Sequence, residues 1–277
     1  MNYRFFLIIV LIALTPLFAQ AQDRVFVNTY QSTTLPKGAK DIEMWNTFKA
    51  GRNYFYNRLD QRIELEVGLT DKLQTSVYIN TEHTAEGAHK DTLGGIADTS
   101  MDGIFKSTLF SVSSEWKLKL SDPVANRVGS ALYAEFTFAP SEIEIEGKLI
   151  MDKRTEKNVF ALNLVAEYEM KFDVKKGKAE AEEEMQAEFD LAYMRMLNPR
   201  FGLGLEAREQ NVFVGGKKEH SAIFGGPTLS YFGDSFFLIL NASPQLANLQ
   251  VNKSNPEKLD LNEFEKMQAR LLIGFSF

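Results

Sequence analysis

The sequence predicts an all-β protein, a transmembrane up-and-down antiparallel β-barrel of about twelve strands. Apolar and polar residues alternate with a period of two along most of the chain, which is typical of strands with one apolar and one polar face. The alternating runs are commonly about 10–16 residues long, whereas soluble strands average about five or six and a membrane strand needs about 9–11. The chain ends inside the last run, on the aromatic Phe277.

The first residues predict an export signal. Arg4 is the only charge in residues 1–21, residues 5–18 are almost wholly apolar, and Ala19-Gln20-Ala21 offers a cleavage site. An apolar run of this length is short for a spanning helix, which needs about 20 residues. We therefore expect a cleaved signal peptide over residues 1–21, an N-terminal periplasmic segment over 22–40 and the barrel over 41–277.

The first six strands are expected near 41–50, 57–69, 72–82, 105–120, 128–139 and 142–151. In the second of them, Ile63, Leu65 and Val67 alternate with charged residues. In the sixth, Ile143 and Ile145 alternate with glutamates. Such strands have one apolar face and one charged face. Tight turns are expected at Thr70-Asp71 and at the short joint 139–141, and a long connection over 83–104.

The last six strands are expected near 157–172, 182–195, 201–213, 219–231, 235–246 and 262–277. Pro199 and Gly233 mark tight turns, and longer connections are expected at 173–181 and 247–261. Tight and long connections tend to alternate, which is the rhythm of an up-and-down meander. The apolar face of the last expected strand ends on Phe275 and Phe277, which predicts a C-terminal signal for the barrel-assembly machinery.

Composition excludes several classes of protein. The chain has no cysteine, which excludes disulfide scaffolds and thiol catalysis, and only three histidines. The 31 basic residues are scattered and outnumbered by 37 acidic ones, so a nucleic-acid partner is not expected. We expect no cofactor and no metal site. The three histidines are His83, His89 and His220, and we interpret the first two as parts of a polar loop.

Several segments resemble an uncharacterised family of Gram-negative outer-membrane β-barrel proteins, a domain of unknown function. The resemblance covers nearly the whole mature chain and is carried by Thr34-Leu35-Pro36-Lys37-Gly38 with Glu43 and Trp45, by Glu66 to Gln74, Ser121-Asp122-Pro123-Val124, Gly204 to Arg208, His220-Ser221-Ala222, Gly226-Pro227-Thr228-Leu229 and Arg270 to Phe277. It implies the barrel and the outer membrane, and no activity.

In a membrane barrel the apolar faces meet lipid and the charged faces line the lumen. The candidate lumen-lining residues are Glu64, Glu66, Glu115, Glu135, Glu144, Glu146, Glu167, Glu169, Glu188, Asp190, Glu206, Arg208 and Arg270. Their acidic excess predicts a small pore that weakly prefers cations. The alternative is a lumen filled by charges that pair with one another, in a structural surface protein.

Two other functions stay open. His220 and Ser221 near a strand end suggest a lipid-modifying hydrolase at the barrel rim, although adjacent strand residues face opposite sides. A secreted soluble β-protein that binds an apolar ligand would show the same alternation. We expect an outer-membrane protein without enzymatic activity, in contact with lipid and lipopolysaccharide, and the sequence does not give its oligomeric state.

Overall fold

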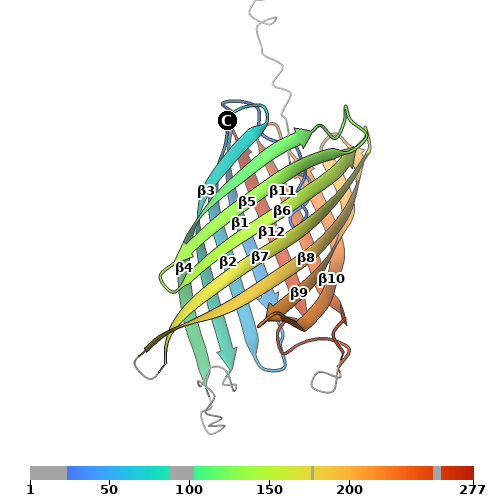
Figure 1. Cartoon of the computed structure of the whole chain (residues 1–277). Coiled ribbons are helices and arrows are strands. Elements are labelled where there is room, and N and C mark those ends of the chain that lie inside the picture. The colour runs from blue at the N-terminus through green and yellow to red at the C-terminus, as the bar shows by residue number, and fades with distance from the viewer. Residues whose placement is uncertain (1–23, 88–102, 176–177, 252–256) are drawn as a thin grey trace, which may run out of the picture.

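The computed structural model describes residues 24–87, 103–175, 178–251 and 257–277. Within these ranges each strand pairs with its neighbour in the chain, and the last strand pairs with the first to close an antiparallel barrel (Figure 1). The strands are β1 (Lys40–Ala50), β2 (Tyr56–Gly68), β3 (Leu73–Gly87), β4 (Ile104–Ser121), β5 (Gly129–Ala139), β6 (Glu142–Arg154), β7 (Asn158–Lys175), β8 (Lys178–Asn198), β9 (Phe201–Val214), β10 (Lys217–Phe232), β11 (Phe236–Asn248) and β12 (Met267–Ser276).

The predicted all-β, up-and-down barrel is therefore confirmed. The predicted signal peptide (residues 1–21) and His89 lie outside the described residues. The described part of the chain contains no helix that is long and apolar enough to span a bilayer.

Some strand ends differ from the sequence expectation. The connection expected at 173–181 is wrong, because β7 and β8 continue to Lys175 and Lys178. The register places Lys171 opposite Glu182 and continues without a break to Lys175 opposite Lys178. The β7–β8 hairpin projects past its neighbours in Figure 1. Likewise β3 runs on to Gly87, and β12 begins only at Met267.

The barrel has two different ends. The terminus end holds Phe277 and the connections that follow β2, β4, β6, β8 and β10. In one of these, the Asp122 carboxylate accepts backbone N–H groups from Ala125 and Val124, which hold the pKa of Asp122 below its ordinary value. The loop end carries the other connections. It includes the two-residue turn Gly215-Gly216, whose φ angles are 58° and 76°. Tight hairpin turns need positive φ angles, which glycine adopts without steric cost because it has no Cβ atom.

The outward surface is apolar along the strands. Leu132, Phe160, Leu164 and Leu191 are each 44–51% exposed, although they lie within regular strands. Soluble proteins rarely expose apolar surface as one contiguous area, whereas a membrane barrel carries it as the band that meets lipid. The alternation read from the sequence therefore corresponds to an apolar outside and a polar inside.

Residues 24–35, called here the N-terminal insert, lie inside the barrel. The sequence predicts a periplasmic segment over residues 22–40, and the structure buries Val25, Phe26 and Val27 of it completely. These side chains pack on inward-facing apolar residues of the strands near the terminus end, among them Phe232 and Leu272. The insert thus forms an apolar core with the barrel wall and occupies the half of the lumen next to the terminus end.

Polar contacts fix the insert to strands on several sides of the barrel. The buried Glu206 carboxylate accepts the backbone N–H groups of Val27, Asn28 and Thr29 at 3.2, 2.7 and 2.9 Å. Asn163 accepts the N–H of Tyr30 at 2.6 Å and donates to its carbonyl at 3.0 Å. Because these contacts are buried, they satisfy backbone groups that would otherwise carry a desolvation cost.

The first and last residues of the insert also contact the barrel wall. Arg24 lies 3.7 Å from Glu43 and 3.4 Å from Glu66, and its guanidinium stacks 4.2 Å from the Tyr30 ring. At the other end Leu35 donates its N–H to the Gln74 side chain at 2.8 Å. The chain therefore enters the lumen from the terminus end, turns near residues 28–30 and comes back toward the same end.

Candidate functional site

A cavity of about 280 Å³ occupies the lumen between the insert and the loop end. Asn28 and Tyr30 of the insert line it, and the remaining lining residues come from β1 to β9 and from β12. Its lining includes nine carboxylates and five basic side chains, a formal excess of four negative charges. These are Asp60, Glu82, Glu135, Glu142, Glu144, Glu146, Glu167, Glu188 and Asp190, against Arg58, Arg62, Lys148, Arg208 and Arg270.

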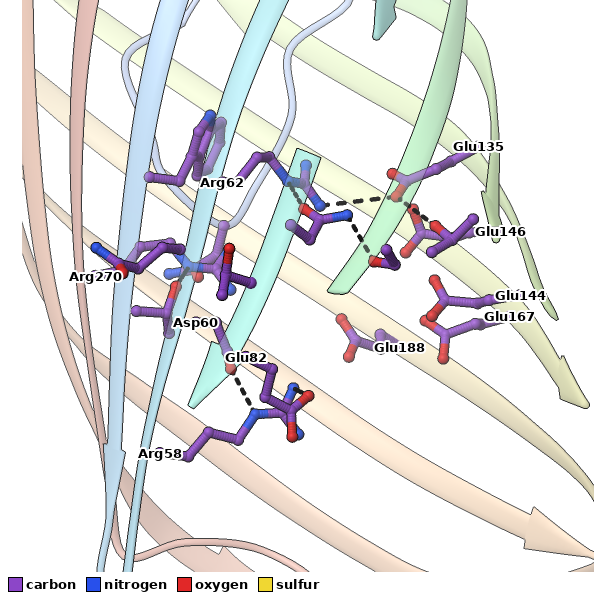
Figure 2. A pocket seen from close by; sticks show the side chains of 18 of the residues that line it. Arg58, Asp60, Arg62, Glu82, Glu135, Glu144, Glu146, Glu167, Glu188 and Arg270 are labelled. Carbon is purple, nitrogen blue, oxygen red and sulfur yellow. Dashed lines mark hydrogen bonds and ion pairs between the residues drawn. The ribbon is translucent and has the colours of Figure 1, made fainter. Parts of the chain in front are cut away.

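One wall of the cavity is acidic. Figure 2 shows Glu144, Glu146, Glu167 and Glu188 side by side on this wall. The register places Glu146 directly opposite Glu167, although like charges in that position destabilise a sheet. Lys148 lies 2.9 Å from Glu146. Neither Glu144 nor Glu167 has a basic side chain within 4 Å among the described residues.

The other wall is basic and holds Arg58, Arg62 and Arg270 (Figure 2). Arg58 is neutralised locally, since Asp60 lies 2.5 Å and Glu82 2.6 Å from its guanidinium. Arg62 stacks 3.9 Å from the centre of the Tyr78 ring and lies 3.7 and 3.9 Å from Glu135 and Glu64. Its charge is therefore shared between two carboxylates.

Arg270 and Arg208 have only neutral partners among the described residues. Arg270 donates to the Thr47 hydroxyl at 2.8 Å and to the Val27 carbonyl at 3.4 Å. Arg208 donates to the Gln268 side chain at 2.5 Å. The register places Asp190 opposite Arg208, yet these two charged groups do not form an ion pair within 4 Å.

The structure divides the thirteen sequence-predicted lumen residues into two groups. Eight of them line the cavity: Glu135, Glu144, Glu146, Glu167, Glu188, Asp190, Arg208 and Arg270. The others face the lumen elsewhere, with Glu64, Glu66 and Glu115 buried around Arg24, Glu206 capping the insert, and Glu169 paired with Lys171 at 2.8 Å. Inward placement follows from the strand period, whereas proximity to the insert does not.

Sequence reasoning missed part of the cavity. Arg58, Asp60 and Arg62 continue the period-two face of Glu64 on β2, so the same alternation could have identified them. Asn28 and Tyr30 had no such signal, because the insert has no periodic pattern. One indication was available: Leu272 and Phe237 are apolar residues on inward faces, and in a polar lumen they need an apolar segment to pack against.

Two groups of buried carboxylates have the spacing of a metal site. They are Asp41, Glu43 and Glu66, and Glu64, Glu66 and Glu115, with oxygens within 4.8 Å of one another. The guanidinium of Arg24 lies 3.4 Å from the shared Glu66 and supplies positive charge to both groups. We therefore interpret these carboxylates as groups that hold Arg24, and with it the insert, in place.

The residues proposed for a rim hydrolase do not assemble a nucleophile and a base. His220 Nδ1 lies 2.7 Å from Asp260 Oδ2, an orienting contact of the kind a catalytic base needs. Ser221, however, is buried and donates to Asn211 at 2.8 Å. Within the described residues no serine hydroxyl is hydrogen-bonded to either ring nitrogen of His220, so the hydrolase alternative gains no support.

Solved structures with a similar fold are outer-membrane barrels. The COG4313 outer-membrane channel from Pseudomonas putida F1 matches with a TM-score of 0.61 and 12% identity, over 92% of this chain and 100% of that one. The β-domain of the Bordetella autotransporter BrkA matches at 0.54 and 9% identity, over 87% and 100%. The translocator domain of NalP from Neisseria meningitidis matches at 0.53 and 10% identity, over 88% and 90%. At such low identity the likeness establishes the fold alone.

No curated protein sequence matches the chain. The sequence model of one family, described as a family of unknown function (DUF6662), matches residues 18–277, which includes every described strand. This match confirms the resemblance found in the sequence segments. The chain has the fold of outer-membrane barrels and belongs to DUF6662, a family of unknown function.

Proposed function

We propose that this protein resides in the outer membrane and admits small polar solutes into its loop-end cavity, with cations preferred over anions. The observation that carries the proposal is the cavity itself, whose lining has an excess of four negative charges inside an apolar-coated barrel. Low-dielectric walls strengthen such a field, so cations are enriched in the cavity relative to bulk solution. The COG4313 relative is an outer-membrane channel, which agrees with this reading.

Passage through the whole barrel requires displacement of the N-terminal insert. The insert occupies the lumen between the cavity and the terminus end, and it is held only by noncovalent contacts such as those of Glu206 and Asn163. We infer that the loop end faces the outside of the cell and the terminus end faces the periplasm. A solute that enters the cavity therefore meets the insert as the barrier to the periplasm.

A covalent lock tests this proposal. Because the chain has no native cysteine, Ser32→Cys with Asp152→Cys introduces a single disulfide between the insert and β6, at a point where the two side chains are hydrogen-bonded. In planar bilayers the oxidised variant should be closed, and reduction should restore the conductance of the wild-type protein. Ser32→Cys alone is the control and should not respond to reductant.

Two outcomes contradict the proposal. Equal conductance of the oxidised and reduced double variant would show that solutes do not need the insert to move. Absence of any conductance in the wild-type and reduced proteins, with correctly folded barrels, would favour a structural surface protein.

A further inference from the structure

Several charged side chains of the cavity are separated from groups of the opposite sign. Among the described residues, Glu144 and Glu167 on the acidic wall have no cationic partner, and Arg270 near the opposite wall has no anionic one (Figure 2). In most buried sites, unlike charges pair directly because unpaired charges are costly to desolvate. Here the opposite charges face one another across a cavity instead.

Buried atoms at the cavity also lack hydrogen-bond partners. Asp190 is 2% exposed, and its Oδ1 has no partner in the described structure. Arg208 is 9% exposed, and its Nε likewise has none. Both residues line the cavity. Unsatisfied buried polar groups are uncommon in folded proteins, and a bound ligand is one way in which such groups become satisfied.

We propose that the cavity binds a small organic zwitterion, with an ammonium group at one end and a carboxylate at the other. The ammonium would lie against Glu144, Glu167 and Glu188, and the carboxylate against Arg270 and Arg208. A guanidinium binds a carboxylate through paired hydrogen bonds, and an ammonium donates three. A cation alone would leave the two guanidinium groups without an anionic partner, and an anion alone would leave the glutamates without a cationic one.

The size of the cavity limits the ligand. Its volume of about 280 Å³ is just below the range of about 300–1,000 Å³ of ordinary ligand pockets, so the ligand is a small molecule and not an oligomer. Glu144 and Glu167 lie on the wall opposite Arg270, which favours an ω-amino acid over an α-amino acid, whose charges are adjacent. This inference rests on the proposed entry of solutes into the cavity and names their class.

Isothermal titration of the full-length protein in detergent tests the site, with 6-aminohexanoate as the probe. 1,6-Diaminohexane and adipate, which carry two charges of one sign, serve as comparison ligands. We expect 6-aminohexanoate to bind more tightly than either of them. Arg270→Gln and Glu167→Gln should each weaken its binding at least tenfold, since each removes one charged contact. Arg200→Gln, at an exposed turn of the terminus end, is the matched control and should bind normally.

Heat-modifiable migration of each variant confirms that its barrel is folded. No binding of 6-aminohexanoate to the folded wild-type protein would overturn the inference. Equal binding of the diamine, unaffected by Arg270→Gln, would also overturn it and leave a simple cation site. Conductance of the same preparations without ligand tests the proposed function separately, because a cation-selective channel without zwitterion binding refutes only this further inference.

Discussion

Glu206 is the residue that ties the insert most closely to the barrel. Its carboxylate accepts three consecutive backbone N–H groups of the insert and the Thr228 hydroxyl at 2.7 Å. A buried carboxylate needs such donors because burial removes its hydration. The same contacts satisfy amides that would otherwise be buried without an acceptor, so the insert and Glu206 depend on each other.

Glu206→Ala should release the insert while the barrel remains closed. Loss of several charge-assisted hydrogen bonds should destabilise the docked insert by about 2–4 kcal/mol. Limited proteolysis of the folded protein measures this directly as faster cleavage within residues 24–35. Glu209→Ala, three residues along β9 from Glu206, is the control. Equal protection of the insert in both variants would contradict the role assigned to Glu206.

Single substitutions also test which face of each strand meets lipid and which faces the lumen. Leu164 is 44% exposed near the middle of β7 and belongs to the lipid-facing band. Leu164→Arg should therefore lower the free energy of unfolding in lipid vesicles by about 2–4 kcal/mol. Ser111→Arg, which places the same side chain in the cavity, should be far less harmful. Equal losses in refolding titrations would mean that the inside and outside of the barrel are wrongly assigned.

At the scale of elements, the insert passes close to the end of β2 as it leaves the lumen. A Cβ atom on Gly68 would overlap the backbone carbonyls of Pro36 and Leu35. Gly68 donates its N–H to Ala39 at 3.0 Å, and its carbonyl accepts the N–H of Gly38 at 2.8 Å. Only glycine allows this approach of two backbones.

Gly68→Ala should consequently reduce the yield of the folded barrel or displace the insert. The reason is that the obstructing atoms belong to the backbone and cannot rotate away as a flexible side chain could. Gly147→Ala is the matched control, since its Cβ would meet nothing closer than 3.9 Å. The heat-modifiable fraction after refolding compares them, and indistinguishable yields would contradict the account of this crossing.

The strands could be predicted from the sequence, and the insert could not. Alternation fixes which residues of β6 and β7 face inward because the strand period is local and regular. The insert is held by contacts such as Val27 to Glu206, which lie 179 residues apart. No local pattern encodes such a contact. The charge count predicted an acidic lumen, but the separation of arginines from glutamates depends on where tilted strands place each side chain.

At the scale of the whole molecule, closure of the barrel joins the first strand to the last. Phe277 donates its N–H to the Lys40 carbonyl at 2.9 Å, next to the β1–β12 pairing, while its side chain is 75% exposed. The exposed ring adds little to packing within the barrel. Recognition of this aromatic residue by the assembly machinery stays a prediction.

Deletion of Phe277 should lower the amount of folded barrel in cells without changing the conductance of the molecules that do fold. Membrane fractionation with heat-modifiable electrophoresis measures the first effect, and bilayer recordings measure the second. Tyr231→Ala, another aromatic near the terminus end, is a comparison that leaves the C-terminus intact. Unchanged levels after deletion of Phe277 would argue against its role as an assembly signal.

The central claim is that an acidic cavity makes the lumen cation-selective. The most direct measurement is the reversal potential across a salt gradient, recorded for the wild-type protein and for Glu144→Gln with Glu167→Gln. We predict a potential of the sign that cation preference gives, reduced in the double variant. It should also weaken as salt shortens the screening length from about 30 Å at 0.01 M to about 10 Å at 0.1 M. A reversal potential of the opposite sign would contradict the claim.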